Sequence, residues 1–359
     1  MAGNSFGKNL VLTTFGESHG SAIGGVLDGF PSNIEIDTKF IQSETDRRKT
    51  GQNPLSSSRK EDDSCEFLSG IFEGKSTGTP IAFIVRNMDQ RPDDYVHLRE
   101  TYRPSHADFV YEQKYGHRDY RGGGRASARE TVARVIGGAL AKIYLQKFDI
   151  SIQGYVSRIG KIGLPENYIP STASDILKSE VACPDEKTSK KMVKLLTELK
   201  KAGDTTGGII TCRINGIPVG LGEPVFDKLQ ADLAKAMMSI NAAKGFEYGT
   251  GFNSAGLSGS SVNDLFIYRN KKIQTATNFS GGIQGGISNG NEIYFNVAFK
   301  PVSTLMQDQV TVNKKGEKVI LKGKGRHDVC VVPRAVPVVE AMAALVISDH
   351  LIGNNIYRL

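Results

Sequence analysis

The sequence YRPSHADFVYEQKYGHRDYRGGGRASARETVAR, residues 102–134, surrounds a glycine triplet with six arginines and two histidines. An apolar pattern with helical spacing follows at once, so the triplet is predicted to be a flexible turn that leads into a helix. Unpaired N–H groups at a helix N-terminus attract anions, and arginine adds planar, bidentate donors that suit carboxylate and phosphate. The stretch therefore predicts a pocket for a small, multiply anionic molecule, with histidines placed for proton transfer.

The same stretch has simpler interpretations. A glycine triplet between arginines is also typical of a solvated loop, and Arg125 and Arg129, four residues apart, could share a helix face that contacts only water. An RGG-like segment could instead bind RNA, with a steep dependence on salt. Against RNA binding, the chain has a single such segment, which runs straight into a helix, and no patterned aromatic platform accompanies it.

The residues after the triplet predict a core helix, because apolar side chains from Val132 to Ile143 recur every three or four positions. Further helices are predicted at 185–201, 224–240 and from near Pro337, and strands at 9–14, 81–85, 209–214 and 292–299. Phe226 is expected on the inward face of the second of these helices. No repeat or linker divides the chain, so we expect one α+β domain over residues 1–359, with helices covered by antiparallel sheet.

Composition limits the class of protein. The chain has 359 residues, a net charge of +7 and four cysteines that form no CxxC pair, which argues against a zinc site or a disulfide framework. We therefore expect no metal. The first residues lack the apolar core of a signal peptide, and the most apolar run, 341–347, is too short to span a bilayer. A cytoplasmic protein that binds an anionic partner, and no membrane, is predicted.

Two other segments carry candidate residues. His19 lies in GESHG, residues 16–20, where two glycines hold it on a tight bend beside a carboxylate and a hydroxyl; a hydrogen-bonded core histidine is an equally good interpretation. The polar segment 45–59 contains Arg47, Arg48 and Lys49 and is predicted to be a mobile loop, either one that closes over a ligand or a solvated charge run.

Five motifs in the same order resemble the chorismate synthase family: GESHG at 16–20, RPSHAD at 103–108, YRGGGRASARET at 120–131, SINAAKG at 239–245 and GRHD at 325–328. The resemblance implies a β-α-β sandwich, with helices packed between antiparallel sheets, and a homotetramer. It also implies a lyase of the shikimate pathway. That enzyme converts 5-enolpyruvylshikimate 3-phosphate to chorismate by 1,4-anti elimination of phosphate and requires reduced FMN without net redox change.

The resemblance also implies roles for individual residues. The catalytic candidates are His19, which would assist the departing phosphate, His106 and Asp328. The residues expected to bind the substrate are Ser18, Arg48, Arg103 and Arg129, with Arg134 as a further candidate. The residues expected to contact FMN are Arg125, Ala126, Ser127, Asn241, Ala242, Gly285, Lys300, Pro301, Val302, Ser303, Thr304 and Arg326.

The sequence departs from the family's pattern at Lys49, Pro54, Ala126 and Val329, and none of these positions is a proposed proton carrier. Some members of the family reduce FMN with NADPH. Because this chain has no extra insert and no separate nucleotide-binding fold, we predict that it depends on an external flavin reductase. A flavin-dependent oxidoreductase with net turnover of reducing equivalents is the third alternative, and the stoichiometry of NADPH per product would distinguish it.

Overall fold

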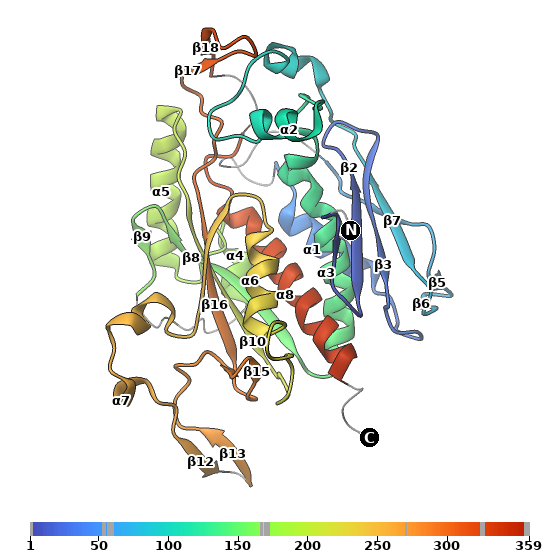
Figure 1. Cartoon of the computed structure of the whole chain (residues 1–359), viewed down its shortest axis with the longest axis vertical. Helices are drawn as coiled ribbons and strands as arrows, with labels where there is room; N and C mark the ends of the chain where they lie inside the picture. Colours follow the sequence, from blue (N-terminus) through green and yellow to red (C-terminus); the bar gives the residue numbers. More distant parts are fainter. Residues whose placement is uncertain are drawn as a thin grey trace.

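A computed structural model describes residues 3–51, 55, 61–165, 168, 173–269, 271–323 and 327–354. Figure 1 shows two sheets that face each other across a layer of helices. Every pairing between the strands is antiparallel. The β-α-β sandwich predicted from the resemblance is therefore confirmed, since each sheet covers its inner face with the apolar side of the helix layer.

The first sheet has the strand order β1-β2-β3-β7-β4. Its strands are β1 (Ser5–Phe6), β2 (Val11–Gly16), β3 (Ala22–Asp28), β7 (Ile81–Arg86) and β4 (Cys65–Phe67). Alternate residues of β7 are buried, which is the pattern of a strand with one face on the core. The register pairs Gly16 with Ile23 and Ala22 with Arg86, so the β2–β3 loop, residues 17–21, lies beside the end of β7.

The second sheet has the order β11-β16-β10-β8-β9. Its strands are β11 (Ala243–Tyr248), β16 (Ile293–Phe299), β10 (Gly208–Asn215), β8 (Ser151–Ile159) and β9 (Ile162–Gly163). The predicted strands at 209–214 and 292–299 are its central strand, β10, and the neighbouring strand β16. Strict alternation of buried and half-buried residues along β16 places Phe295 and Val297 on the helix layer.

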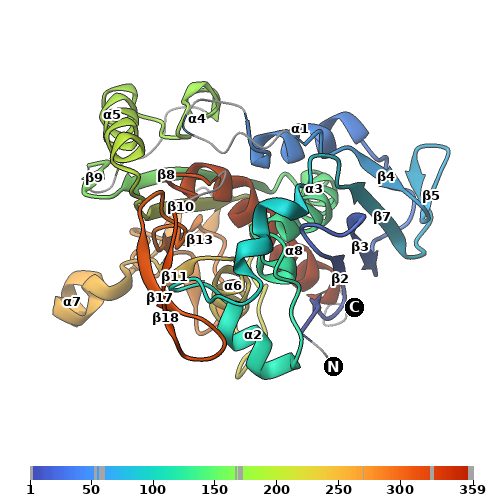
Figure 2. The same ribbon diagram turned by 90° about the horizontal axis from the view of Figure 1, so that it is seen from above.

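Four helices fill the space between the sheets: α1 (Thr38–Arg48), α3 (Thr131–Gln146), α6 (Leu229–Met238) and α8 (Val332–Asn354). Figure 2 shows α3 and α8 side by side at the centre, with β8 and β10 on one side and β2, β3 and β7 on the other. Gly138 of α3 makes this close contact possible, since a Cβ there would lie 2.3 Å from Cβ of Ala341 in α8.

Helix α8 is, among the described residues, the one helix long and apolar enough to cross a membrane. Nearly all of its residues are buried within the fold, including Val332, Met342 and Ile347. Its apolar character is therefore explained by contact with β8 and β10 of the second sheet and with three other helices, as for a central core helix.

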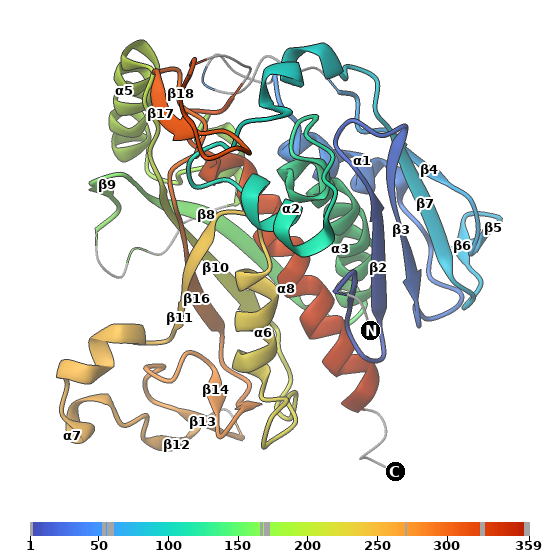
Figure 3. The ribbon, with the colours of Figure 1, turned by 45° about the horizontal axis from the view of Figure 1, so that its top comes forward.

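Other elements surround this core. They are the helices α2 (Asp108–Tyr115), α4 (Ala173–Lys178), α5 (Glu186–Ala202) and α7 (Gly259–Val262), the 3₁₀ turns η1 (Pro92–Leu98), η2 (Gly124–Ala126), η3 (Ala128–Glu130) and η4 (Gly251–Gly256), and the hairpins β5 (Ile71–Phe72) with β6 (Lys75–Ser76), β12 (Phe266–Arg269) with β13 (Lys272–Thr275), β14 (Ile283–Gln284) with β15 (Ile287–Ser288) and β17 (Gln309–Val312) with β18 (Lys318–Leu321). Figure 3 shows α2 and the β17–β18 hairpin together at one end of the sandwich.

Three local predictions were wrong. Arg47 and Arg48 lie in the last turn of α1 and not in a mobile loop, because Asp37 caps a helix that runs to Arg48. The helix predicted from 224 begins at Leu229, since 223–227 form a turn closed by a Glu223–Asp227 bridge, and Phe226 is 89% exposed. The last helix begins at Val332, so Pro337 lies inside it. Pro54 and Arg326 lie outside the described residues.

Candidate active site

The glycine triplet is followed by two short 3₁₀ turns, η2 and η3, and α3 begins only at Thr131. The prediction that the triplet leads directly into a helix was therefore wrong. All three glycines have positive φ, with Gly123 at +87°, a conformation that glycine adopts without steric cost. The chain can thus fold back sharply here and bring its backbone against neighbouring side chains.

Two histidines lie against this triplet on different glycines. A Cβ at Gly122 would lie 2.2 Å from Cε1 of His19, and a Cβ at Gly123 would lie 3.0 Å from Cε1 of His106. The two candidate proton carriers, 87 positions apart in the sequence, are therefore brought to adjacent residues of one turn. Glycine is required at Gly122 because any side chain would enter the space of the His19 ring.

His19 is buried and held by several contacts. Its Nδ1 lies 3.0 Å from the Ser18 hydroxyl, which also contacts the carbonyl oxygen of Arg121 at 3.3 Å. The Tyr95 ring meets the His19 ring edge-on, with 4.9 Å between centroids. Ser18 thus contacts the candidate acid itself.

His106 lies between an arginine and a carboxylate. Its Nδ1 is 3.0 Å from Nη2 of Arg103, which can only donate, and 3.0 Å from Oδ1 of Asp108, which accepts when ionised. Burial lowers the pKa of His106, and the charge of Arg103 acts in the same direction against the opposing effect of Asp108. The neutral imidazole is therefore favoured at neutral pH.

Arg103 and Asp108 form a paired group beside that ring. Asp108 accepts from Nε of Arg103 at 2.8 Å, from Nη2 at 2.7 Å and from the backbone N–H at 3.0 Å. Burial alone would raise the pKa of Asp108, but its hydrogen bonds with Arg103 and His106 hold it well below the usual range. The bidentate contact fixes the plane of the guanidinium.

Arg48 and Arg129 share one buried carboxylate. Nη2 of Arg48 lies 2.5 Å from Oδ2 of Asp63, and Nη1 of Arg129 contacts the other oxygen. Burial would raise the pKa of Asp63, but the two arginine charges hold it below 3.8. Within the described part of the chain, Nε of Arg48 and Nη2 of Arg129 are buried donors without a hydrogen-bond acceptor. Such donors are costly unless a ligand or water accepts from them.

Asp328 is paired with Arg334 near the start of α8. Nη1 of Arg334 contacts Oδ2 of Asp328, and its Nε donates to the carbonyl oxygen of Arg48 at 2.9 Å. Burial lowers the pKa of Arg334, although the charge of Asp328 opposes that effect. Arg334 therefore joins Asp328 to the segment that carries Arg48.

A cavity of about 1260 Å³ lies between the first strands, the triplet region, the end of α6 and the start of α8. This volume is above the usual range of about 300–1,000 Å³ for ligand pockets. The residues predicted to form the site that line it are Arg48, His106, Arg125, Ala126, Asn241, Ala242, Lys300, Pro301, Val302 and Ser303.

The cavity wall combines apolar surface with polar groups. Val302, Val338 and Met342 contribute apolar surface, which suits a planar ring system. The Asn241 amide donates to the carbonyl oxygen of Ala126 at 3.1 Å, and its Oδ1 is buried without a donor among the described residues. An unsatisfied acceptor beside an apolar wall fits an aromatic ligand with N–H groups, such as a flavin.

The cations of the wall are anchored to the protein. Arg125 donates to the carbonyl oxygen of Thr14 at 2.8 Å, and Lys300 donates to the carbonyl oxygen of Ser105 at 2.9 Å. Burial lowers the pKa of Lys300, and Lys244 acts in the same direction. Arg134, also on the wall, donates to Glu130 at 3.1 Å. These contacts hold each cation in place and leave positive charge beside the cavity.

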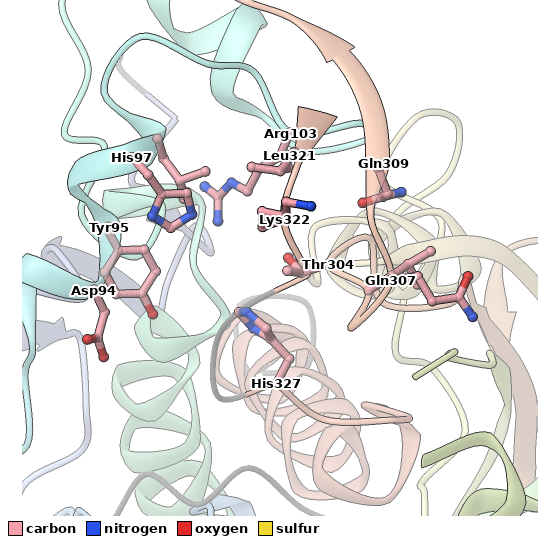
Figure 4. Close-up of a pocket in the computed structure, with 12 residues that line it drawn as sticks. Asp94, Tyr95, His97, Arg103, Thr304, Gln307, Gln309, Leu321, Lys322 and His327 are labelled. Atoms are coloured by element: carbon pink, nitrogen blue, oxygen red, sulfur yellow. The ribbon is translucent and has the colours of Figure 1, made fainter. Parts of the chain in front are cut away.

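Arg103 and Thr304 line a smaller pocket between η1 and the β17–β18 hairpin. In Figure 4 the guanidinium of Arg103 lies between His97 and Lys322, and His327 faces them from the segment that leads into α8. The two pockets are neighbours, because Arg103 contacts His106 on the wall of the large cavity.

Some predicted residues lie on neither cavity wall. His19 contacts Tyr95 on the wall of the smaller pocket, and Asp328 contacts Arg334 on the wall of the large cavity. Ser18 contacts His19, Arg129 is bonded to Asn87 and Asp63, and Ser127 caps η3. Gly285 lies in the β14–β15 turn, whose Gly286 accepts a hydrogen bond from the first residue of α6. The cavity contacts the other end of α6, roughly 15 Å away at 1.5 Å per residue. The structure therefore does not bring Gly285 to the cavity within one chain.

The sequence reasoning missed several partners of the site residues. They are the carboxylates Glu61, Asp63 and Asp108, the amide of Asn87 and the guanidinium of Arg334. Asp108 had a signal, since it follows His106 within the RPSHAD motif. No motif marked Asp63 as a site residue, because it lies 66 positions from its partner Arg129.

Comparisons with known proteins identify the family of the chain. A family profile described as Chorismate synthase matches residues 10–352. The chain is 58% identical to the chorismate synthase of Christiangramia forsetii over 99% of both chains, and 58% identical to that of Cytophaga hutchinsonii over the same shares. A solved chorismate synthase structure superposes with a TM-score of 0.78 at 31% identity, covering 97% of this chain and 93% of that one. The chain therefore belongs to the chorismate synthase family.

Proposed function

We propose that the large cavity binds reduced FMN together with 5-enolpyruvylshikimate 3-phosphate, and that this site carries out the lyase reaction of the family. The observation that carries the proposal is the set of residues on one cavity wall. Eight of the residues expected at FMN, among them Arg125, Asn241 and Lys300, line the same space as Arg48 and His106. Its volume of about 1260 Å³ suits two ligands better than one.

The arginines are proposed to bind the substrate's two carboxylates and its phosphate. Asp63 already neutralises part of the charge of Arg48 and Arg129, so the substrate would bind to the donors that remain, Nε of Arg48 and Nη2 of Arg129. Arg103 would add a third guanidinium from the neighbouring pocket. Fixed donors of this kind stabilise charge on a departing phosphate without reorganisation.

The remaining cavity residues fit a bound flavin. Asn241 Oδ1 would accept from a ring N–H, the apolar residues would cover the ring, and Lys300 and Arg125 would supply positive charge. When bound, reduced FMN supplies transient electron density to the substrate and takes it back, which explains a cofactor requirement without net redox change.

His19 and His106 are proposed to move protons. His19 would donate a proton towards the departing phosphate, and neutral His106 would hold a proton at the cavity wall. Asp328, held by Arg334 near the start of α8, would assist the proton transfer from the substrate. We expect His19→Ala and His106→Ala each to lose activity strongly, by about 100-fold or more. Full activity in either variant would remove that histidine from the mechanism.

The direct test is phosphate release from the substrate under anaerobic conditions. Release should occur with reduced FMN and stop with oxidised FMN, and reductant consumed per product should be far below one. Release without flavin would exclude the proposed cofactor. One reducing equivalent pair consumed per product would favour the oxidoreductase alternative instead.

The wider biology of the protein is also proposed. We propose a cytoplasmic, single-domain enzyme that acts as a homotetramer and receives reduced FMN from an external flavin reductase. NADPH oxidation by the purified protein with FMN alone would contradict the reductase requirement, and sedimentation at the mass of a single chain would contradict the tetramer. RNA binding is disfavoured because Arg118, Arg125 and Arg129 donate to acceptors within the chain.

A further inference from the structure

Asn87 lies where the antiparallel register of the first sheet brings two parts of the site together. β3 starts at Ala22, which pairs with Arg86 at the end of β7. Asn87, the residue that follows β7, therefore lies opposite Ser21, and its backbone N–H donates to the Ser21 carbonyl oxygen at 3.1 Å. Ser21 ends the β2–β3 loop that carries His19.

The side chain of Asn87 uses its amide nitrogen and its amide oxygen for different partners. Nδ2 donates to the carbonyl oxygens of Glu17 at 3.1 Å and Gly20 at 2.8 Å, on either side of His19. Oδ1 accepts from Nε of Arg129 at 2.9 Å. The orientation of the amide is fixed, since two carbonyls need its N–H groups and a guanidinium needs its oxygen. Asn87 is only 6% exposed.

The contact with Arg129 orients that guanidinium. Its Nε donates to Asn87 and its Nη1 to Asp63, so the plane of the guanidinium, and with it the position of Nη2, is fixed at two points. Nη2 lies 3.8 Å from Glu61 and is a buried donor without a hydrogen-bond acceptor among the described residues. Asn87 therefore decides where the remaining donor of Arg129 points, as well as the shape of the loop that holds His19.

We propose that Asn87 is a positioning residue that fixes the Arg129 guanidinium relative to the His19 imidazole. Resting on the proposed function, this means that the anion on Arg129 and the proton carrier His19 are held in one geometry. Misplacement of reacting groups by about 1 Å can cost on the order of 100-fold in rate. Asn87 itself touches no reacting atom.

The alternative is that Asn87 only joins the ends of β3 and β7. Asn278 provides a matched control, because its amide also donates to a carbonyl oxygen, of Glu292 at 2.8 Å, and accepts a backbone N–H, of Gly282 at 2.8 Å. Asn278 lines neither cavity. Asn278→Ala should thus remove two side-chain hydrogen bonds, against three for Asn87→Ala, without affecting the site.

The experiment measures phosphate release and thermal unfolding for wild type, Asn87→Ala and Asn278→Ala. We expect kcat/KM of Asn87→Ala to fall by about 10- to 100-fold, and that of Asn278→Ala to stay within about twofold, with similar losses in unfolding midpoint. If kcat/KM of Asn87→Ala stays within about twofold of wild type, the proposal is wrong. If Asn87→Ala does not fold, Asn87→Ser is measured against the same limits.

A double-mutant cycle separates positioning from general loosening. Lys lacks the Nε–H that Asn87 accepts, so Asn87→Ala should cost less in an Arg129→Lys background than in the wild type. Losses that simply multiply would overturn the proposed link. The cycle can be interpreted only if the wild-type protein releases phosphate. If the wild type releases no phosphate, the proposed function is wrong. The positioning of the loop by Asn87 is then tested by amide hydrogen exchange at residues 17–21. Faster exchange in Asn87→Ala than in the wild type supports the positioning, and unchanged exchange overturns it.

Discussion

A methyl group at Gly122 would occupy space that the His19 ring fills, and this shows how closely backbone and side chains fit at the site. Its Cβ would lie 2.2 Å from Cε1 and 2.3 Å from Nδ1 of His19. The charged side chains around the site are also paired with one another. The arginines Arg48, Arg129 and Arg334 face the carboxylates Glu61, Asp63 and Asp328. This pairing lowers the cost of burying the guanidiniums before any substrate arrives.

At the residue scale we predict that Gly122→Ala lowers phosphate release by about 100-fold, because the new Cβ displaces the His19 ring. Gly74→Ala is the control, since Gly74 also has positive φ, +76°, but nothing lies within 4 Å of its added Cβ. The control shares the backbone strain of roughly 1–2 kcal/mol and should keep its kcat. Equal activity losses in both variants would mean that strain, not contact with His19, is responsible.

At the scale of elements, the α3–α8 contact depends on one of two adjacent glycines. An added Cβ at Gly138 would lie 2.3 Å from Cβ and 2.4 Å from Cα of Ala341, whereas one at Gly137 would lie 3.0 Å from Cδ2 of Leu12. A leucine side chain can move aside, but the backbone of a packed helix cannot do so without moving α8 as a whole.

We therefore predict that Gly138→Ala destabilises the protein and that Gly137→Ala does so less, or not at all. Both changes gain about 1 kcal/mol of helix propensity, so propensity cancels in the comparison. The difference between the two variants should be about 1–3 kcal/mol, the usual cost of overpacking, as measured by denaturant unfolding. Equal stabilities would show that α3 and α8 are farther apart than the structure places them.

A buried carboxylate joins four elements of the core. Glu340 of α8 accepts from Arg47 of α1 at 2.6 and 2.9 Å, from Lys142 of α3 at 2.6 Å and from the backbone N–H of Gly154 in β8 at 2.8 Å. Burial would raise the pKa of Glu340, but the charges of Arg47 and Lys142 hold it well below 4.5. A depressed carboxyl pKa stabilises the fold above the unfolded value and loses that effect below it.

Stability should accordingly fall as the pH drops below 4.5. Glu340→Gln should unfold more easily at neutral pH, by about 1–3 kcal/mol, because Arg47 and Lys142 lose one of the two carboxylates that they share and keep only Glu44. It should also show a shallower loss of stability in acid than the wild type. Urea unfolding between neutral pH and acid tests both points, with Glu186→Gln as the control for an exposed pair with Lys190. Parallel curves for wild type and Glu340→Gln would contradict this prediction.

At the scale of the whole molecule, the large cavity is lined by residues from the first sheet, from the segment after β16 and from all four core helices, α1, α3, α6 and α8. Lys8 and Thr14 come from the first sheet's side, Lys300 from the end of β16, and Met342 from α8. A ligand in this cavity contacts both sides of the sandwich, so it can bind the folded chain but not the unfolded one. Such binding raises stability by mass action.

We predict that FMN raises the thermal unfolding midpoint, with a gain of about 2.7 kcal/mol when the ligand is at 100 times its Kd. Riboflavin, which lacks the phosphate, should raise it less, because it leaves the charge of Lys300 and Arg125 unused. Asn241→Ala should reduce the shift for both ligands, since it removes the buried acceptor. No shift with FMN, with or without substrate, would mean that the cavity is not the flavin site.

The features that could be predicted from the sequence are those that depend on residues close together along the chain. The core helix α3 and the strands β7, β10 and β16 followed from local apolar periodicity, which depends on neighbouring residues alone. Helix starts were less certain, and two of them were misplaced by five residues, because caps and turns compete with periodicity there.

The sequence by itself determined the family, the sandwich and the residue types of the site, because motifs such as GESHG and GRHD are local patterns of chemistry. Only the tertiary structure decided the partners: that one turn places Gly122 on His19 and Gly123 on His106, and that Asp63 serves both Arg48 and Arg129. Contacts between residues so far apart arise when the two sheets close over the helices. No local pattern encodes them, since each depends on the packing of the whole chain.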